Sequence, residues 1–266
     1  MTDTQETQNE IAALRELARD FFTKEVAPRY EEFAAEGQPD RALYRRAGEL
    51  GLLCISVPEE YGGGGATFAH ETVLFEEQAR AGELSMQLGV HSGIVPHYLL
   101  SYASEEQKLR WLPKLASGEW IGAIAMTEPG TGSDLQNIRT TARRDGDHYV
   151  VNGSKTFITN SSHAGLVVIV ARTGGEGAQG LSLVVAEVDG LEGFERGRVL
   201  QKIGQHGQDT RELAFTDMRV PVANLLGEEE GQGFYQLMTQ LPQERLAIAV
   251  GAVASAEKAV DLAVAY

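Results

Sequence analysis

The stretch AMTEPGTGSDLQNIRT (residues 125–140) places a proline, two glycines and short hydroxyl side chains directly after the apolar run IGAIAM. Glycine lets backbone N–H groups approach a ligand closely, and Thr and Ser add short hydrogen-bond donors. Such a loop can contact phosphate groups or the edge of a heteroaromatic ring. Composition alone favours an ordinary Gly/Pro turn, and the hydroxyls of Thr127, Thr131 and Ser133 only weaken that interpretation.

Outward from this stretch, hydrophobic periodicity divides the chain into three regions. We predict an α+β multidomain fold with an N-terminal all-helical domain (1–120), a middle β-barrel or β-sandwich domain (121–230) and the start of a C-terminal helical bundle (231–266). In the first region, apolar residues three to five positions apart predict one buried helix face: Ile11, Leu14, Leu17, Phe21 and Val26. Ser104 and Gln107 form a capping-box pattern that predicts a helix start.

In the middle region, short β-rich runs follow one another without intervening helices, which favours a sandwich or barrel over a doubly wound parallel sheet. The runs are HYVV, KTFIT, LVVIVA, LSLVVAEV, RGRVL and TRELAFTDMRV. Asp145-Gly146 and Asn152-Gly153 are predicted as two-residue turns. The glycines of GGEGAQG match a dinucleotide-binding spacing, but a strand rather than a helix follows them, so we predict a hairpin loop.

The last region begins after GEEEGQG and is an Ala- and Val-rich helical run that contains LPQERLAIA. We expect the chain to be a fragment, or to receive further helices from another chain, because an apolar helix needs neighbours. Pro242 is predicted to bend or restart the helix, with Glu244 close to that point. Apolar flanks would raise the pKa of Glu244 by desolvation, whereas a helix start would favour the anion. The sequence leaves both directions open, and Glu244 with Arg245 also fits a solvated surface pair.

Composition excludes several classes of protein. The 266 residues carry a formal net charge of −15, which argues against nucleic-acid binding. The N-terminus is polar and acidic, unlike a targeting peptide, and no apolar run approaches the ~20 residues of a membrane span. The single cysteine, Cys54, lies in the apolar run GLLCISV and is predicted to be a buried structural thiol. Together these features predict a cytoplasmic protein.

The chain resembles the acyl-CoA dehydrogenase family over its whole length. The resemblance is carried by LGLLCISVPEEYGG, SEEQKLRWLPKLASGEWIGAIAMTEPGTGSDL, VNGSKTFITN, QKIGQHGQDTRELAFTDMRVP, NLLGEEEGQGF and LPQERLAIAVGAV. TEPGTGSD followed by NGSKTFITN at this spacing is highly specific. The fold that the family implies has the same order of regions: helices, β-domain, helical bundle.

The resemblance implies an FAD site and no metal. One wall of the site would be formed by Ile124, Ala125, Met126, Thr127, Glu128, Pro129, Gly130, Thr131, Gly132 and Ser133, with Thr127 as donor to the pyrimidine side of the ring. The other wall would come from Phe157, Ile158 and Thr159. Implied contacts with the acyl-CoA substrate are Ser133, Tyr235, Pro242, Gln243 and Arg245.

Glu244 matches the catalytic base of the long-chain and isovaleryl-type branches, although many members carry the base later in the bundle. The implied reaction removes the proton alpha to the thioester while the beta hydride moves to flavin N5, giving a trans-2-enoyl-CoA in fatty acid β-oxidation. The resemblance further implies an electron-transferring flavoprotein as electron acceptor and a homo-oligomer built as a dimer of dimers. The position of the base favours long-chain or isovaleryl-like substrates.

Two alternatives accompany this interpretation. The same scaffold could serve a flavin oxidase or monooxygenase, in which oxygen accepts the electrons. A chain without most of the bundle could instead be an inactive fragment that binds acyl-CoA or a partner.

Overall fold

The first part of the chain is helical. The computed structural model describes residues 2–266, with side chains from residue 7 onward. The helices before the sheet are α1 (Thr2–Phe21), α2 (Tyr30–Glu36), α3 (Arg41–Glu49), α4 (Phe68–Ala81), α5 (Leu88–His91), α6 (Val95–Tyr102) and α7 (Glu105–Ala116). Ser104 caps α7, and the reciprocal Ser104–Gln107 hydrogen bonds confirm the predicted capping box.

The predicted apolar face of the first helix is only partly correct. α1 ends at Phe21, and a π-helical turn follows at Phe22–Val26. This change in winding rotates the side chains relative to a regular 3.6-residue repeat. Phe21 and Val26 are buried as expected, but Leu17 is 39% exposed and the neighbouring Ala18 occupies the core instead.

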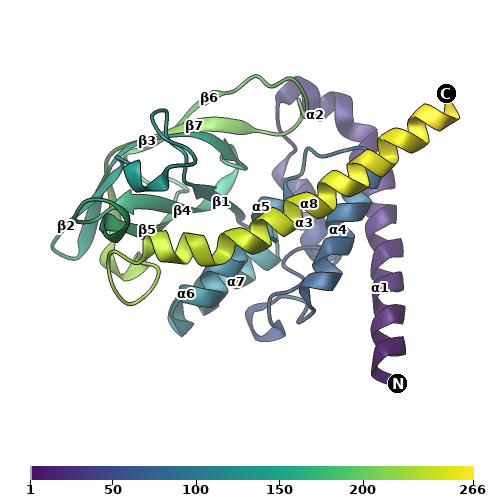
Figure 1. The fold of residues 1–266 in the computed structure, drawn as a ribbon, viewed down its shortest axis with the longest axis horizontal. Coiled ribbons are helices and arrows are strands. Elements are labelled where there is room, and N and C mark those ends of the chain that lie inside the picture. Colours follow the sequence, from purple (N-terminus) through teal and green to yellow (C-terminus); the bar gives the residue numbers. More distant parts are fainter. Residues whose placement is uncertain (1) are drawn as a thin grey trace.

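The middle of the chain forms a seven-stranded sheet that curls around a core of its own (Figure 1). Its strands are β1 (Ile121–Ala125), β2 (Thr141–Asp145), β3 (His148–Thr159), β4 (Ala164–Arg172), β5 (Leu181–Glu187), β6 (Phe194–Val199) and β7 (Thr210–Pro221). The order is β1-β4-β2-β3-β7-β6, with β5 also paired to β4. Most pairings are antiparallel; β4 pairs in parallel with β1 and, at one position, with β2. The predicted fold class is confirmed, and GGEGAQG connects the antiparallel strands β4 and β5.

Strand β4 separates two hydrophobic cores. Leu166, Val168 and Val170 pack with the helical part of the chain, whereas Val167 and Ile169 face the interior of the curled sheet. Alternation of side chains along a strand produces this division. The sheet is therefore covered by helices on one side and closed by its own strands on the other.

One of the two predicted turns is wrong. Gly146 has φ +63° and turns the chain between β2 and β3, as predicted. Asn152 and Gly153, however, lie inside β3, where the register to β7 shifts between Val151 and Gly153. Gly153 has φ +151°, and a Cβ there would lie 2.4 Å from Oγ1 of Thr140. The glycine therefore permits a bulge and a close approach of two segments, rather than a hairpin.

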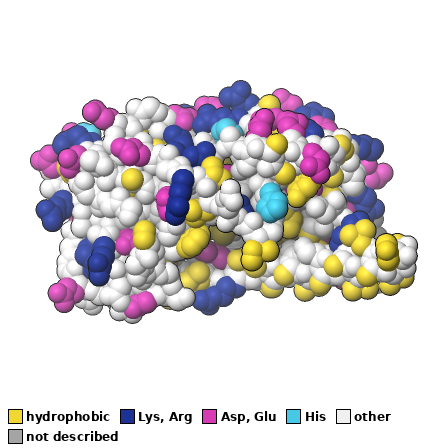
Figure 2. Space-filling view, turned by 90° about the horizontal axis from the view of Figure 1, so that it is seen from above, with side chains coloured by type: hydrophobic (Ala, Val, Ile, Leu, Met, Phe, Trp, Pro, Cys, Tyr) yellow, Lys and Arg dark blue, Asp and Glu magenta, His cyan; other side chains and the backbone are white. Residues whose placement is uncertain are grey.

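The last element, α8 (Gly233–Ala265), is one helix that continues through Pro242. Of the two predicted alternatives the restart is wrong, whereas Figure 1 shows a change of direction along α8, which agrees with the predicted bend. α8 packs mainly on α4, and Arg80 joins the two helices through Glu257 at 3.2 Å. Its distal part carries exposed apolar side chains, seen at the lower right of Figure 2, including Val253, Val260, Leu262 and Val264. None of the helices described has the length and apolar character needed to cross a membrane.

Candidate active site

A cavity of about 410 Å³ lies between α4, the segment around α5, and α8. Its apolar lining includes Phe75, Leu84, Val90, Ile94, Ala247 and Ile248. Polar side chains from distant parts of the sequence also reach it, among them Thr159 at the end of β3, Gln205 in the loop before β7, and Glu244 on α8. Gln78, Gln87 and Ser255 complete the polar lining. The cavity is thus a mainly apolar space with a few polar groups, which is the usual character of a small-molecule site.

Glu244 is the ionisable residue of this cavity. It is only 7% exposed, and its Oε1 accepts a hydrogen bond of 2.6 Å from the hydroxyl of Tyr98. Burial raises the pKa of Glu244, although the Tyr98 hydroxyl and the charge of Arg245 act in the opposite direction. Glu244 lies about three turns after the start of α8 at Gly233, too far for the helix dipole to act on it. The structure thus decides between the two directions that the sequence left open.

The loop of TEPGTGSD is held to the strand of KTFIT. The backbone N–H of Thr156 donates to the carbonyl of Thr127 at 2.9 Å, and within the loop Glu128 and Thr131 exchange backbone hydrogen bonds. Gly130, Gly132 and Ser133 are exposed. A Cβ on Gly130 would meet no atom within 4 Å, so packing within the chain does not require that glycine. The two predicted flavin walls are therefore adjacent, and the loop leaves space on its open side.

A buried ion pair supports this loop from below. Nζ of Lys155 lies 3.0 Å from Oε1 of Glu128, and donates to the carbonyls of Met126 (3.0 Å) and Val170 (2.7 Å). Burial lowers the pKa of Lys155 to about 8. Burial alone would raise the pKa of Glu128, but Lys155 and the backbone N–H groups of Arg139 and Thr140 hold it below its usual value. The Glu128 side chain is thus engaged inside the protein, where it anchors the start of the loop.

The two residues that precede Thr159 in the predicted second flavin wall differ in their exposure to solvent. Phe157 has φ +60° and is 66% exposed, because the β3–β7 register shifts between Lys155 and Ile158. Ile158 is buried in the sheet core and contributes packing rather than a free side chain.

Asn160 fixes the end of this strand. Its Oδ1 accepts from the hydroxyl of Tyr44 (3.1 Å), and its Nδ2 donates to the carbonyls of Gln87 (3.2 Å) and Gly122 (3.3 Å). One side chain thus joins α3, the segment before α5, β1 and β3. Because Thr159 and Gln87 both line the Glu244 cavity, this network sets the position of two of its walls.

The predicted substrate contacts on α8 are dispersed. Tyr235 is 49% exposed and lines a different cavity of about 530 Å³ beside α6. At about 100° per residue, Tyr235 and Pro242 lie on the side of the helix opposite Glu244. Arg245 is exposed, and the amide nitrogen of Gln243 is buried without a hydrogen-bond partner in the described structure. The structure brings none of the four into the Glu244 cavity.

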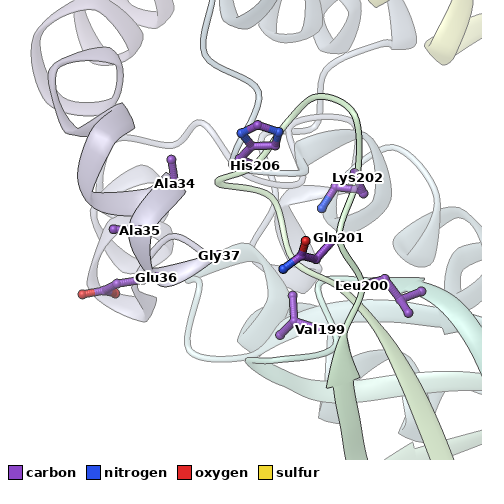
Figure 3. A pocket seen from close by; sticks show the side chains of 9 residues that line it. All are labelled: Ala34, Ala35, Glu36, Gly37, Val199, Leu200, Gln201, Lys202 and His206. Carbon is purple, nitrogen blue, oxygen red and sulfur yellow. The ribbon is translucent and has the colours of Figure 1, made fainter.

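A further cavity, of about 380 Å³, contains no predicted site residue. It lies between the end of α2 and the segment after β6 (Figure 3). Figure 3 shows Gln201 and Lys202 directed toward α2, with Glu36 turned away from them. The Lys202 ammonium is engaged by the carbonyl of Gln208 at 2.5 Å.

Sequence reasoning missed Tyr98, Gln205, Lys155 and Asn160 as parts of the site. Lys155 and Asn160 carried a usable signal, because a lysine in a half-buried strand and an asparagine at its end both need partners when buried. Tyr98 and Gln205 carried none, since each meets the cavity only through tertiary packing.

The fold places the buried carboxylate of Glu244 in a cavity between the helices and the curled sheet. The sheet also carries an exposed loop that contains Gly130 and Gly132. The profile of the acyl-CoA dehydrogenase N-terminal domain matches residues 8–119, that of the middle domain residues 123–218, and that of the C-terminal domain residues 231–266. The chain belongs to the acyl-CoA dehydrogenase family, as its sequence motifs suggested.

Individual relatives agree. The chain is 47% identical over 246 residues to the mitochondrial long-chain specific acyl-CoA dehydrogenase of Sus scrofa, covering 91% of this chain and 57% of that protein. It is 50% identical to the acyl-CoA dehydrogenase of Geobacillus kaustophilus, whose crystal structure superposes with a TM-score of 0.90 over 94% of this chain and 66% of that one. The acyl-CoA dehydrogenase of Bacillus anthracis, solved with FAD, is 37% identical with a TM-score of 0.90, over 97% of this chain and 44% of that one. The chain thus spans little more than half the length of the mammalian relative.

Proposed function

We propose that this chain carries the catalytic base and much of the flavin site of an FAD-dependent acyl-CoA dehydrogenase. The observation that supports it most is the carboxylate of Glu244, buried in an apolar cavity that also contains Thr159 of the predicted flavin wall. A base of raised pKa in an apolar space is suited to removing a weakly acidic carbon-bound proton near neutral pH.

The residues present fit a flavin. The loop of Gly130, Gly132 and Ser133 is open, its backbone is held by the Lys155–Glu128 pair, and Phe157 stands exposed beside it. The Bacillus anthracis relative with this fold was solved with FAD. When bound, FAD supplies the acceptor for the hydride that leaves the beta carbon. Thr127 and the neighbouring loop backbone would hold its ring, and Thr159 would lie at the border between ring and substrate.

This chain's own part in the reaction is to bind, orient and deprotonate. The apolar lining of the cavity would hold the acyl chain and exclude water, which keeps the Glu244 carboxylate poorly solvated and basic. Glu244 would take the alpha proton, and the product would be a trans-2-enoyl thioester. Ser133 remains the proposed contact to the CoA part, and an electron-transferring flavoprotein the proposed acceptor of the electrons.

The test is anaerobic addition of acyl-CoA thioesters to the FAD-loaded protein. We expect loss of flavin absorbance with at least one member of a chain-length panel. A flavin that stays oxidised with every member would contradict the proposal. Rapid return of colour in air, with formation of peroxide, would assign the protein to the oxidases instead.

Gly251 offers a test of the acyl cavity. A Cβ on this residue would meet no atom within 4 Å, and the residue lines the cavity on the same face of α8 as Glu244, about two turns further along. We expect Gly251→Leu to fill part of the space and to lower kcat/KM for long acyl chains by roughly 10- to 200-fold, the range that small changes in a hydrophobic pocket produce. Short-chain substrates should be affected little.

The matched control is Ala249→Leu, which adds a similar side chain on the same helix but outside this cavity. Equal losses for all chain lengths in Gly251→Leu, or the same selectivity change in Ala249→Leu, would show that the cavity does not hold the acyl chain.

A further inference from the structure

Tyr98 is the closest hydrogen-bonding neighbour of Glu244. The tyrosine is fully buried in α6, where its ring lies 6.4 Å from that of Tyr102. Its hydroxyl donates to Oε1 of Glu244 at 2.6 Å, across 146 residues of sequence. A buried tyrosine hydroxyl and a buried carboxylate each need such a partner, so the two side chains satisfy one another.

The bond involves only one oxygen of the carboxylate. Among the described residues, none donates to Oε2, and that atom is not one of the buried polar atoms left without a partner. Since Glu244 lines the cavity, Oε2 is the oxygen available to a molecule bound there.

We propose that Tyr98 is a positioning residue for the catalytic base, holding one carboxylate oxygen of Glu244 so that the other faces the substrate as an anion. This inference rests on the proposed function of Glu244. The hydroxyl does not itself exchange the proton, because burial and the neighbouring Glu244 charge raise the pKa of Tyr98 far above the neutral range.

The surroundings of Glu244 make Tyr98 the main group that opposes desolvation. Arg245 is the other charged neighbour that lowers the pKa of Glu244, and it is exposed to solvent. In the described part of the chain, the other elements packed around the cavity present only side chains that do not titrate. They include Phe75 and Gln78 from α4; Gln87, Val90 and Ile94 near α5; and Thr159 and Gln205 from the β-region. A hydrogen bond to the charged form of a carboxyl group favours that form.

Tyr98→Phe tests the inference, with Tyr102→Phe as the control. Tyr102 lies one turn further along α6, and its hydroxyl contacts the backbone carbonyl of Gln236 rather than Glu244. The titration of the Glu244 carboxyl can be followed by carbon-13 NMR in the protein without flavin, with the signal assigned by its loss in Glu244→Gln. We expect Tyr98→Phe to raise this pKa by about one unit, and Tyr102→Phe to leave it unchanged.

Flavin reduction gives the second measurement. The carboxylate is the active form, so the rate falls as pH drops through the pKa of Glu244. In Tyr98→Phe this fall should begin about one unit higher, giving about a tenfold lower rate on the acid side and a convergence with the parent at high pH.

Three results would overturn the inference: an unchanged or lowered Glu244 pKa in Tyr98→Phe, the same shift in Tyr102→Phe, or a loss of rate that is equal at every pH. Failure of the proposed function is recognised separately. If Glu244→Gln reduces flavin at the parent rate, Glu244 is not the base, whatever the NMR titration shows for the pair.

Discussion

Glu244→Gln is expected to slow the reduction of flavin by acyl-CoA by about 10²- to 10⁴-fold, the contribution of a well-placed general base. Glutamine keeps the size of the side chain and an oxygen that can accept from Tyr98, so the cavity should keep its shape. What is lost is the ability to take a proton. The measurement is anaerobic stopped-flow absorbance at saturating substrate, with bound flavin quantified in both proteins.

The control for Glu244→Gln is Glu257→Gln, on the same helix. That side chain is 57% exposed and pairs with Arg80 at 3.2 Å. It should change the rate little. A Glu244→Gln protein that binds flavin and is reduced as fast as the parent would show that the base lies elsewhere and that Glu244 has a structural role.

Lys155→Met is expected to destabilise the protein by about 3–5 kcal/mol, because it leaves the Glu128 carboxylate buried without its counter-charge. Both side chains are almost inaccessible, at 0% and 6% exposure. The loss also frees the carbonyls of Met126 and Val170, so the loop of TEPGTGSD, proposed to hold the flavin, should loosen. Thermal unfolding with and without FAD measures both effects, and we expect weaker flavin binding in the folded variant.

Arg198→Met is the matched control for Lys155→Met. It breaks the ion pair between Arg198 and Glu212, in which the arginine side chain is 74% exposed. An exposed pair contributes about 1 kcal/mol or less. Similar stability losses in the two variants would mean that the burial of Lys155 and Glu128 is not what makes their pairing important.

The sequence predicted the order of helices, sheet and final helix because periodicity is a local property. Most strands were recognised from short apolar runs. The runs are clearest in β4 and β5, because these two strands are buried on both faces. The turn predicted at Asn152-Gly153 is wrong because a glycine is suited to a bulge as well as to a turn. The bulge brings Gly153 close to Thr140, which is not adjacent in sequence, so the sequence could not reveal this contact. The restart predicted at Pro242 is wrong because α8 continues through this residue as one helix, although its direction changes along its length.

The candidate site was predicted by resemblance more than by local pattern. The loop, the strand KTFIT and Glu244 could be chosen in this way, and the structure places Glu244 and Thr159 in one cavity. The assignment of individual contacts to flavin and substrate stays a prediction, as do the domain boundaries, the oligomeric state and the cytoplasmic location. Tyr98 could not be found from sequence, since its importance depends on a hydrogen bond between α6 and α8.

The separation of 146 residues between Tyr98 and Glu244 has a consequence for biosynthesis. Domains tend to fold in the order in which the ribosome releases them. A nascent chain translated as far as β7 already contains the loop and strand proposed to hold the cofactor, yet Glu244, the proposed proton acceptor, has not been made. The proposed activity on a thioester would therefore arise late, only after α8 has emerged from the exit tunnel and packed against α6.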